Sequence, residues 1–458
     1  MRMRKDILIL GGGISGLSLA WRLSQKGIGS QMIEAQSFVG GLAGTVWQGP
    51  YGIDFGPHSF FTEDREVLEA VRSLYPEGLG EHKRSVKMAY QGKLLDYPFT
   101  AANLLFSMGP WSMLQTVWSY LISGFNRAKK SQFNEDEETV EDWALRSCGP
   151  HLYRSFFKPY TEEFWQMACS ELSARSIPSH TRTSFLNTLK TLIRKKFEGE
   201  GSMLEREKLP TYYPLKGYGD ISERISSVLQ KSGAEISLRS RVTQIQKSHS
   251  GWKVNVMSIE GEKEIEAPIV VSTLPLPNVV KLLGASLSQK THDAAAHLIF
   301  RPFLFLAIVV KKEFVLNCGY MYTLGKPYNR LTDMNRFSRD LSPAHENILG
   351  LEIPCKLNDT LWNASKEEIL EICLPYLEKD GILKREEVSG VLLVKAPQAY
   401  PIYQKGYRKY LEVVQHEMDQ LRGFYSLGRG GEFMYMDADR CIRKAFDLGD
   451  RIAEMVAE

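Results

Sequence analysis

Three glycines near the start of the chain have the spacing of a phosphate-binding turn. Gly11, Gly13 and Gly16 form a GxGxxG motif directly after the apolar run at residues 7–10. The first glycine permits the tight turn, the second lets the backbone approach a diphosphate, and the third lets the next helix pack on the strand. The helix N-terminus, with Ser15 in its first turn, supplies free N–H donors and a positive dipole end. The motif predicts a dinucleotide site.

An acidic residue follows at the place where a ribose would be held. Glu34 ends a second apolar stretch at about residues 31–34, and Ala35 comes directly after it. A carboxylate here accepts hydrogen bonds from both ribose hydroxyls and repels a 2′-phosphate. A strand before the turn and a helix after it complete the pattern of a βαβ dinucleotide-binding unit.

A second pair of glycines indicates which dinucleotide is bound. Gly40 and Gly41, followed by Leu42, lie in QSFVGGLAGT at residues 36–45, and GIDFGPHSFF follows at 52–61. A second close approach of backbone to ligand suits a cofactor longer than NAD. We therefore expect FAD, held without a covalent bond.

The composition limits the class of protein and its partners. The chain has 458 residues, with 57 basic and 54 acidic side chains and a formal net charge of +3. This length suggests two or three domains, and the charge balance gives no reason to expect nucleic acid. The six cysteines form no CxxC pair. We therefore expect neither a metal site nor a disulfide framework, and a reducing cytosol is the natural compartment.

One uncharged stretch has two interpretations. No charged residue occurs between Pro98 and Asn126. Gly109 and Pro110 interrupt the stretch, whereas a spanning helix needs about 20 mostly apolar residues, so a pair of buried helices is the first interpretation. The second is a surface that rests on a membrane, peripheral to its cytoplasmic face, assisted by the basic residues at 127–130.

The elements that must position these residues indicate an α/β fold. Apolar periodicity predicts helices at 64–75, 140–175 and 364–379 and a last helix at 437–458, and the second of these is expected to be capped near Thr139. It also predicts strands at 303–312, at 348–354 and within 235–272. A Rossmann-type FAD-binding domain would be assembled from residues 1–94, 211–285 and 425–458. A mostly helical substrate domain would cover 95–210, and an antiparallel-sheet substrate domain would cover 286–424.

Several motifs, taken in order, resemble a known family. The chain is similar to the flavin-containing amine oxidase superfamily, and within it to UDP-galactopyranose mutase and to protoporphyrinogen oxidase-like flavoproteins of polysaccharide gene clusters. The resemblance runs nearly end to end. It is carried by the two glycine motifs and by GPHSFFT (56–62), FFKPYTEEFW (156–165), PYNRLTDMNRFS (327–338) and GRGGEFMYMDADRCI (428–442).

The resemblance implies a set of cofactor contacts beyond the glycine turns. Val242, Gly428, Arg429 and Asp437 would touch FAD, and His58 would lie beside the isoalloxazine. From the residues alone, the alternative for His58 is a structural histidine in a turn, and the alternative for one of Asp437 and Asp439 is a helix cap.

The resemblance also implies a substrate site with catalytic and binding residues. Arg330 and Arg429 would hold the substrate diphosphate, since a guanidinium fork suits such a group; surface or structural ion pairs are the alternative. Five aromatic residues in these motifs and in AYPIYQKGY (399–407) would line the substrate pocket; for those at helical spacing the alternative is simple packing in a helix core. They are Tyr160, Trp165, Tyr400, Tyr403 and Tyr435.

Two departures from the mutase pattern leave the substrate open. Phe61 replaces the second histidine of the GPH motif, and Met434 stands where a basic residue is usual. The first hypothesis is a mutase-like enzyme in which flavin N5 attacks an activated sugar. The second is an oxidase or dehydrogenase that passes hydride to the flavin. The third, a flavin-stabilised binding protein, would leave the paired arginines unexplained.

Overall fold

A five-stranded parallel sheet holds the dinucleotide motif. The computed structural model describes residues 6–90, 92–97, 138–177 and 209–457, with scattered positions between 109 and 119. The sheet order is β17-β11-β1-β2-β7, and every neighbouring pair is parallel. The strands are β1 (Ile7–Leu10), β2 (Ser30–Ile33), β7 (Glu235–Ser237), β11 (Ile269–Ser272) and β17 (Phe424–Ser426). This is the doubly wound sheet that the first glycine turn predicts.

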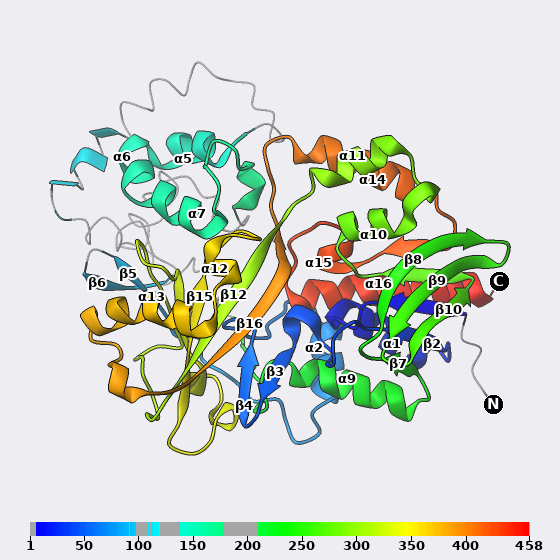
Figure 1. Ribbon diagram of the computed structural model, residues 1–458, viewed down its shortest axis with the longest axis horizontal. Coiled ribbons are helices and arrows are strands. Elements are labelled where there is room, and N and C mark those ends of the chain that lie inside the picture. The colour runs from blue at the N-terminus through cyan, green and yellow to red at the C-terminus, as the bar shows by residue number, and fades with distance from the viewer. Residues whose placement is uncertain are drawn as a thin grey trace.

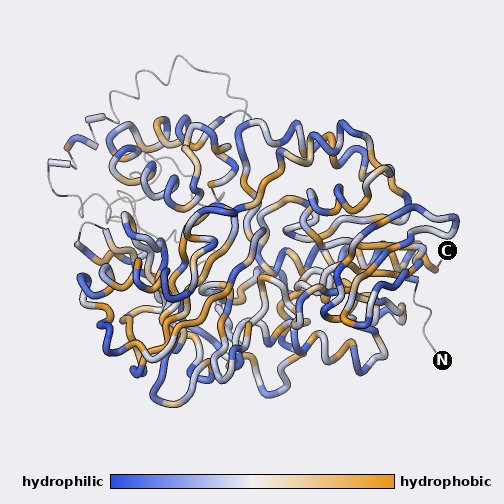
Figure 2. The backbone as a smooth tube through the Cα atoms, viewed as in Figure 1, coloured by the Kyte–Doolittle hydropathy of each residue, from blue (hydrophilic) through white to orange (hydrophobic). Residues whose placement is uncertain are grey.

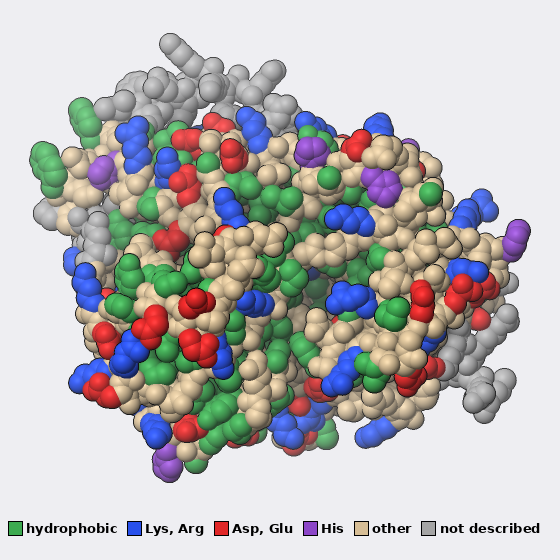
Figure 3. All heavy atoms as spheres, in the orientation of Figure 1, with side chains coloured by type: hydrophobic (Ala, Val, Ile, Leu, Met, Phe, Trp, Pro, Cys, Tyr) green, Lys and Arg blue, Asp and Glu red, His purple; other side chains and the backbone are tan. Residues whose placement is uncertain are grey.

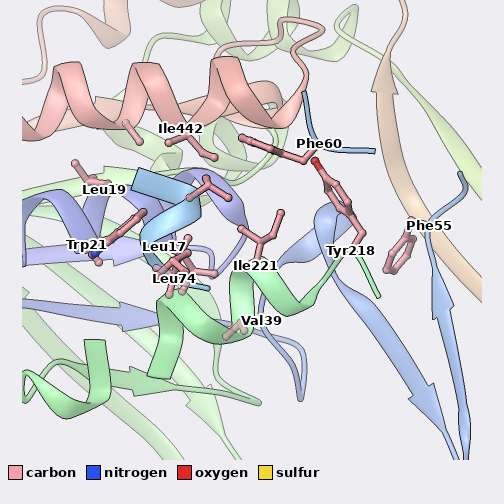
Figure 4. Packing of buried hydrophobic residues seen from close by; sticks show 14 of the residues in the cluster. Leu17, Leu19, Trp21, Val39, Phe55, Phe60, Leu74, Tyr218, Ile221 and Ile442 are labelled. Atoms are coloured by element: carbon pink, nitrogen blue, oxygen red, sulfur yellow. The ribbon is translucent and has the colours of Figure 1, made fainter. Parts of the chain in front are cut away.

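Helices from distant parts of the chain cover this sheet. Three of them are α1 (Ile14–Gln25), α9 (Asp220–Lys231) and α16 (Ala438–Ala457). Figure 4 shows Leu17 and Trp21 of α1 packed among apolar side chains of α9 and α16. Arg22 adds a two-pronged ion pair to Asp450, at 2.8 and 2.7 Å. The C-terminal helix therefore closes the N-terminal domain, as the sequence predicts.

A seven-stranded sheet forms the other half of the molecule (Figure 1). Its order is β16-β12-β15-β14-β13-β5-β6, antiparallel except between β13 and β5. The strands are β5 (Val86–Tyr90), β6 (Lys93–Asp96), β12 (Phe300–Val310), β13 (Tyr320–Tyr322), β14 (Arg330–Asp333), β15 (Asn347–Ile353) and β16 (Val388–Pro401). Residues 86–90 and 93–94, placed in the first segment of the predicted FAD domain, thus lie in strands of this sheet, together with residues 95–96 from the predicted helical domain. The division into domains stays a prediction.

The remaining elements connect and cover the two sheets. A three-stranded antiparallel sheet contains β8 (Arg241–Ser248), β9 (Gly251–Ser258) and β10 (Gly261–Ala267), and a hairpin contains β3 (Thr45–Gln48) and β4 (Tyr51–Asp54). The other helices are α2 (Arg65–Ser73), α5 (Val140–Cys148), α6 (Pro150–Leu152), α7 (Lys158–Trp165), α10 (Leu276–Leu283), α11 (Gln289–Ala296), α12 (Thr360–Asn363), α13 (Lys366–Lys379), α14 (Tyr407–Met418) and α15 (Gly428–Gly431). Figure 2 shows apolar residues concentrated on the central strands.

The helix expected over residues 140–175 is broken into pieces. It begins as predicted at Thr139, whose side chain and Asp142 form a capping box. Gly149, with φ of 81°, then ends α5, and Pro150 starts the next turn. After a wide π-turn at Tyr153–Phe157, α7 stops at Gln166, whose φ is 54°. Positive φ at these two positions interrupts the helix although the apolar spacing continues.

Candidate active site

The glycine turn lies at one end of a cavity. Gly11 has a φ of 103°, and a Cβ there would lie 2.3 Å from Thr273 Oγ1. A Cβ on Gly16 would lie 2.2 Å from the Gly11 carbonyl oxygen, so this glycine lets α1 pack on β1. Gly13 is the N-cap of α1 and no side chain caps the helix. The first amides of α1 are therefore available to an anion in the cavity.

Glu34 is positioned at the same end of the cavity by two backbone amides. Its carboxylate accepts hydrogen bonds from the N–H groups of Gly12 and Gln36, both at 2.7 Å. The second glycine pair approaches from the other side, because the Gly40 N–H donates to the Gly12 carbonyl at 2.8 Å. Gly40 has a φ of 102°. The two glycine segments that the sequence singled out therefore meet as one backbone-lined cradle.

The cavity continues from this cradle towards side chains of the C-terminal turn. It is lined by Gly11, Gly13, Ser15, Glu34, Gly40, Gly41, Leu42, His58, Phe60, Phe61, Tyr218, Thr273, Pro275, Phe300, Gln398, Arg429, Met436, Asp437 and others. Predicted cofactor and catalytic residues from both ends of the chain are thus brought together. The space-filling view in Figure 3 shows the molecule hollowed near its centre on one face.

His58 lies in the cavity wall as a neutral imidazole. Its ring centroid is 4.9 Å from that of Tyr218. Burial, together with the positive charges of Arg429 and Arg330, lowers the pKa of His58 to about 3. Its Nδ1 makes no hydrogen bond with any residue that the structure describes. A neutral ring with an unpaired buried nitrogen is suited to contact a ligand in the cavity.

Asp54 anchors the segment on which Tyr218 lies. Its buried carboxylate accepts hydrogen bonds from the hydroxyls of Thr45 and Tyr213, both at 2.6 Å, and from the Tyr218 N–H at 3.2 Å. Burial raises the pKa of Asp54 to about 6, although these hydrogen bonds oppose the rise. The β3–β4 hairpin and the turn at 213–219 are therefore locked together beside His58.

Arg429 reaches the cavity from α15. Its Nε donates to the Met436 carbonyl at 2.9 Å, and a second nitrogen donates to the same oxygen. The guanidinium carbon lies 4.8 Å from the ring centre of Tyr435 and 5.6 Å from that of Tyr400. Both distances fall within cation–π range. Arg429 thus lies against two of the predicted substrate-site tyrosines.

Arg330 lies beside the GPH motif and forms an ion pair with buried Glu352. One guanidinium nitrogen is 3.0 Å from where a Cβ on Gly56 would be, so that glycine makes room for the arginine. Burial acts to lower the pKa of Arg330, but the attraction of Glu352 and the contributions of Tyr322, Tyr400 and Tyr320 together outweigh it, and the pKa is raised. Arg330 is therefore a fixed cation near His58.

A third buried arginine, Arg301 on β12, was not predicted from the sequence. It is 1% exposed, and its nearest carboxylate is that of Glu352 at 3.7 Å. Its side-chain nitrogens make no hydrogen bond within the described part of the chain. Its guanidinium carbon lies 4.2 Å from the Phe164 ring centre and 5.5 Å from that of Tyr400. Tyr400 is thus between two arginines.

The other predicted residues lie in the surroundings of the cavity. Tyr160 and Trp165 are partly buried against the apolar cluster around α5 and α7, the helix-core position that was their alternative. Tyr403 is 8% exposed, and its hydroxyl accepts the Tyr435 N–H at 2.7 Å. The predicted site residues that do not line the cavity are Gly16, Ala35, Tyr160, Trp165, Val242, Arg330, Tyr400, Tyr403, Gly428 and Tyr435. Their roles stay predictions.

Three functional candidates were missed by the motif reasoning: Asp54, Arg301 and Glu352. Arg301 and Glu352 each stand alone as a charged residue within a fully buried strand, β12 and β15. Because an isolated buried charge is costly, such a residue in an apolar strand is itself a signal. Among the described residues there is no group of three or more His, Cys, Asp and Glu side chains that could hold a metal.

Comparison with known proteins gives the class. A sequence profile of the flavin containing amine oxidoreductase family matches residues 14–425, and the chain belongs to this family. A flavin cofactor follows from that membership. The glycine cradle, with its uncapped helix end and Glu34, fits the adenosine diphosphate portion of such a cofactor.

Individual relatives point in two directions. Rice (Oryza sativa subsp. japonica) chloroplastic protoporphyrinogen oxidase is 25% identical, covering 100% of this chain and 90% of its own. A Klebsiella pneumoniae protein named "Probable UDP-galactopyranose mutase" is 29% identical over 37% of this chain and 43% of its own. A reduced UDP-galactopyranose mutase structure has a TM-score of 0.84 at 18% identity, covering 100% and 95% of the two chains. At that identity the structural likeness shows the fold alone.

Proposed function

We propose that this protein binds FAD without a covalent link and acts on an anionic substrate, an activated sugar or glycan precursor, through flavin N5 in the manner of a mutase. The observation that carries the proposal is the excess of buried positive charge. Three arginines, Arg301, Arg330 and Arg429, lie around Tyr400 and His58. Two carboxylates act on them: Glu352 lies beside Arg301 and Arg330, and Asp437 attracts Arg429. An anionic substrate group supplies the missing negative charge.

The chain's own residues have distinct roles in this proposal. Arg429 and Arg330 hold the diphosphate of the substrate, and the stacked rings of Tyr400 and Tyr435, 6.1 Å apart, form a wall for it. His58, kept neutral, contacts the cofactor without adding charge. When bound, the flavin supplies a nucleophilic nitrogen, so no side-chain nucleophile is required.

The test is a trapping experiment with reduced flavin. The purified protein is reduced without oxygen and mixed with a panel of nucleotide sugars and a mild borohydride, and the released flavin is weighed by mass spectrometry. A mass increase of one sugar supports the proposal and identifies the substrate class. An unchanged flavin mass with every sugar, with fast reoxidation in air and peroxide release, would overturn the mutase chemistry.

The second candidate is an FAD-dependent oxidase or dehydrogenase of the amine oxidase or protoporphyrinogen oxidase type. The observation that favours it is the similarity to plant protoporphyrinogen oxidases across the whole chain. In this case the arginines would bind carboxylates of the substrate. Flavin bleaching without oxygen by an amine or a porphyrinogen, with no sugar adduct, is the result expected for this candidate.

We also propose a peripheral membrane contact. No helix within the described residues is long and apolar enough to cross a bilayer. Trp111, Leu114 and Trp118, at helical spacing, are 72%, 62% and 68% exposed, whereas Ser112 bonds to His151 at 2.8 Å on the protein side. Exposed tryptophans of this spacing suit a lipid interface. Flotation with anionic vesicles tests the contact, and W111S/W118S should abolish it; flotation unchanged in that variant would overturn it.

A further inference from the structure

A second cavity lies directly outside the cofactor cavity. Its volume is about 450 Å³, and it lies between α10, α11 and the end of β16. Phe300 and Gln398 line both cavities. These two side chains therefore form part of the wall between the outer cavity and the cofactor.

The wall is completed by a pair of carboxamides. The Asn278 side-chain amide on α10 donates to Gln398 Oε1 at 2.6 Å, and the Gln398 amide donates back to Asn278 Oδ1 at 3.2 Å. The pair joins a helix that follows the parallel sheet to a strand of the seven-stranded sheet. It thus crosses between the two halves of the molecule at the edge of the cofactor cavity.

The carboxamide pair is the part of this wall that can open. Phe300 is 8% exposed and packs edge-on against Phe433, with ring centroids 5.1 Å apart. The Asn278–Gln398 pair is neutral and partly exposed, so each amide can exchange its partner for water at little net cost. Gln398 lines both cavities, so rotation of its side chain away from Asn278 is the movement that would connect them while Phe300 stays in place.

The chemistry of this wall differs from that of the substrate site. Its inner surface is neutral, because Phe300 and Gln398 contribute one phenyl ring and one amide to it. The charged groups of the outer cavity are Lys281, His292 and Asp293, on α10 and α11. His292 Nε2 is already engaged by the Gly284 carbonyl at 2.9 Å. An anion is attracted to the three buried arginines instead, so the neutral wall suits a small uncharged solute.

We propose that Asn278 and Gln398 form the gate of a second route to the flavin. This route admits a small uncharged electron acceptor, and dioxygen serves as the probe for it. The inference rests on the flavin binding of the proposed function. In the probe reaction, anionic two-electron-reduced flavin, dioxygen and one proton give oxidised flavin and hydrogen peroxide. The flavin is oxidised and the oxygen is reduced, and no further reactant is needed.

The test measures the rate at which photoreduced, flavin-loaded protein regains its visible absorbance in oxygenated buffer. N278A/Q398A should reoxidise about two- to tenfold faster, the range expected from loss of one neutral hydrogen-bonded pair. Ala296→Trp places an indole in the outer cavity at an exposed position and should slow the reaction. Lys290→Trp, on the same helix but outside the cavity, is the matched control and should leave the rate unchanged.

A second measurement does not depend on turnover. Acrylamide, an uncharged quencher, should quench bound-flavin fluorescence more strongly in N278A/Q398A and less strongly in A296W, while iodide quenching stays constant. If A296W matches K290W in both measurements, the solute reaches the flavin elsewhere and the inference is wrong, whether or not the double variant folds. Wild-type protein that neither contains nor takes up FAD would overturn the proposed cofactor itself, and the route with it.

Discussion

The two ends of the cofactor cavity are built in different ways. The first end, the glycine cradle, is formed mainly by backbone from one short part of the chain, in which Gly12 contacts both Glu34 and Gly40. The second end contains Arg429 of α15 and adjoins a cluster of side chains from β12, β14, β15 and β16, which are far apart in sequence and of which Arg301, Arg330, Glu352 and Tyr400 do not themselves line the cavity. A backbone site depends on local conformation, whereas a side-chain site depends on how the sheets pack.

The two ends also attract anions by different means. The first end presents the N–H groups at the start of α1, and its glycines let the backbone lie close to a bound anion. The second end has three arginines, of which Arg301 is fully buried and Arg330 and Arg429 are partly buried, and Glu352 lies beside Arg301 and Arg330. Removing a charged side chain from the arginine end should therefore cause a large loss of stability. A substitution in the glycine cradle should mainly lower the affinity for the cofactor.

The largest effect is expected at Glu352. Glu352→Gln leaves Arg301 and Arg330 buried without their carboxylate, and should lower the free energy of unfolding by about 3 kcal/mol. Arg301→Met removes a cation that makes no hydrogen bond with the described residues, and should stay within about 1 kcal/mol of wild type. Urea unfolding followed by tryptophan fluorescence gives both values. If both variants lost the same free energy of unfolding, the interpretation that this region carries an excess of positive charge would be wrong.

A pH effect of similar size is expected at Asp54, which connects the two ends through Tyr218. Its folded-state pKa of about 6 lies above the unfolded value of 3.8. Stability from this group is therefore fully present below the unfolded pKa and is lost as pH rises through about 6. The loss is on the order of 3 kcal/mol.

Asp54→Asn should remove this pH dependence. Unfolding free energies measured from pH 4 to 7 should show the wild-type protein losing more stability than the variant over this range. An identical slope for both proteins would mean that Asp54 does not titrate as its burial implies.

A smaller and more selective effect is expected at the glycine turn. Gly16→Ala brings a Cβ to 2.2 Å from the Gly11 carbonyl, and should cost about 2 kcal/mol of stability. Gly13→Ala meets no atom closer than 3.9 Å, and should change the stability of the cofactor-free protein by less than about 0.5 kcal/mol.

The two glycine variants separate packing from binding. Both variants should retain less flavin, measured as visible absorbance per protein. Gly16→Ala disturbs the glycine turn itself, whereas Gly13→Ala adds a Cβ to a residue that lines the cavity where we expect the diphosphate. Full flavin content in Gly13→Ala would show that the phosphates lie elsewhere in the cavity.

The smallest effect is expected at Glu34. Glu34→Gln keeps one acceptor oxygen but leaves either the Gly12 or the Gln36 N–H without a partner, and should weaken flavin binding by about 1 kcal/mol. Thermal stability of the cofactor-free protein serves as the control and should change little. Titration of apoprotein with FAD measures the affinity, and an unchanged affinity would remove Glu34 from the predicted ribose contact.

The sequence alone determined the βαβ unit, the glycine cradle and the closing C-terminal helix, because each depends on residues near one another in the chain or on strong apolar periodicity. It also predicted Thr139 as a helix cap. It did not predict the breaks at Gly149 and Gln166, since backbone conformation there overrides the apolar spacing.

Only the tertiary structure decided the charge balance of the arginine end. Arg330 was predicted from a motif, but its partner Glu352 and its neighbour Arg301 lie on other strands, and β-sheet pairing brought them together. Likewise, Asn278 and Gln398 are 120 residues apart, and no local pattern connects them. Interactions of this kind depend on long-range packing, which residue spacing does not encode.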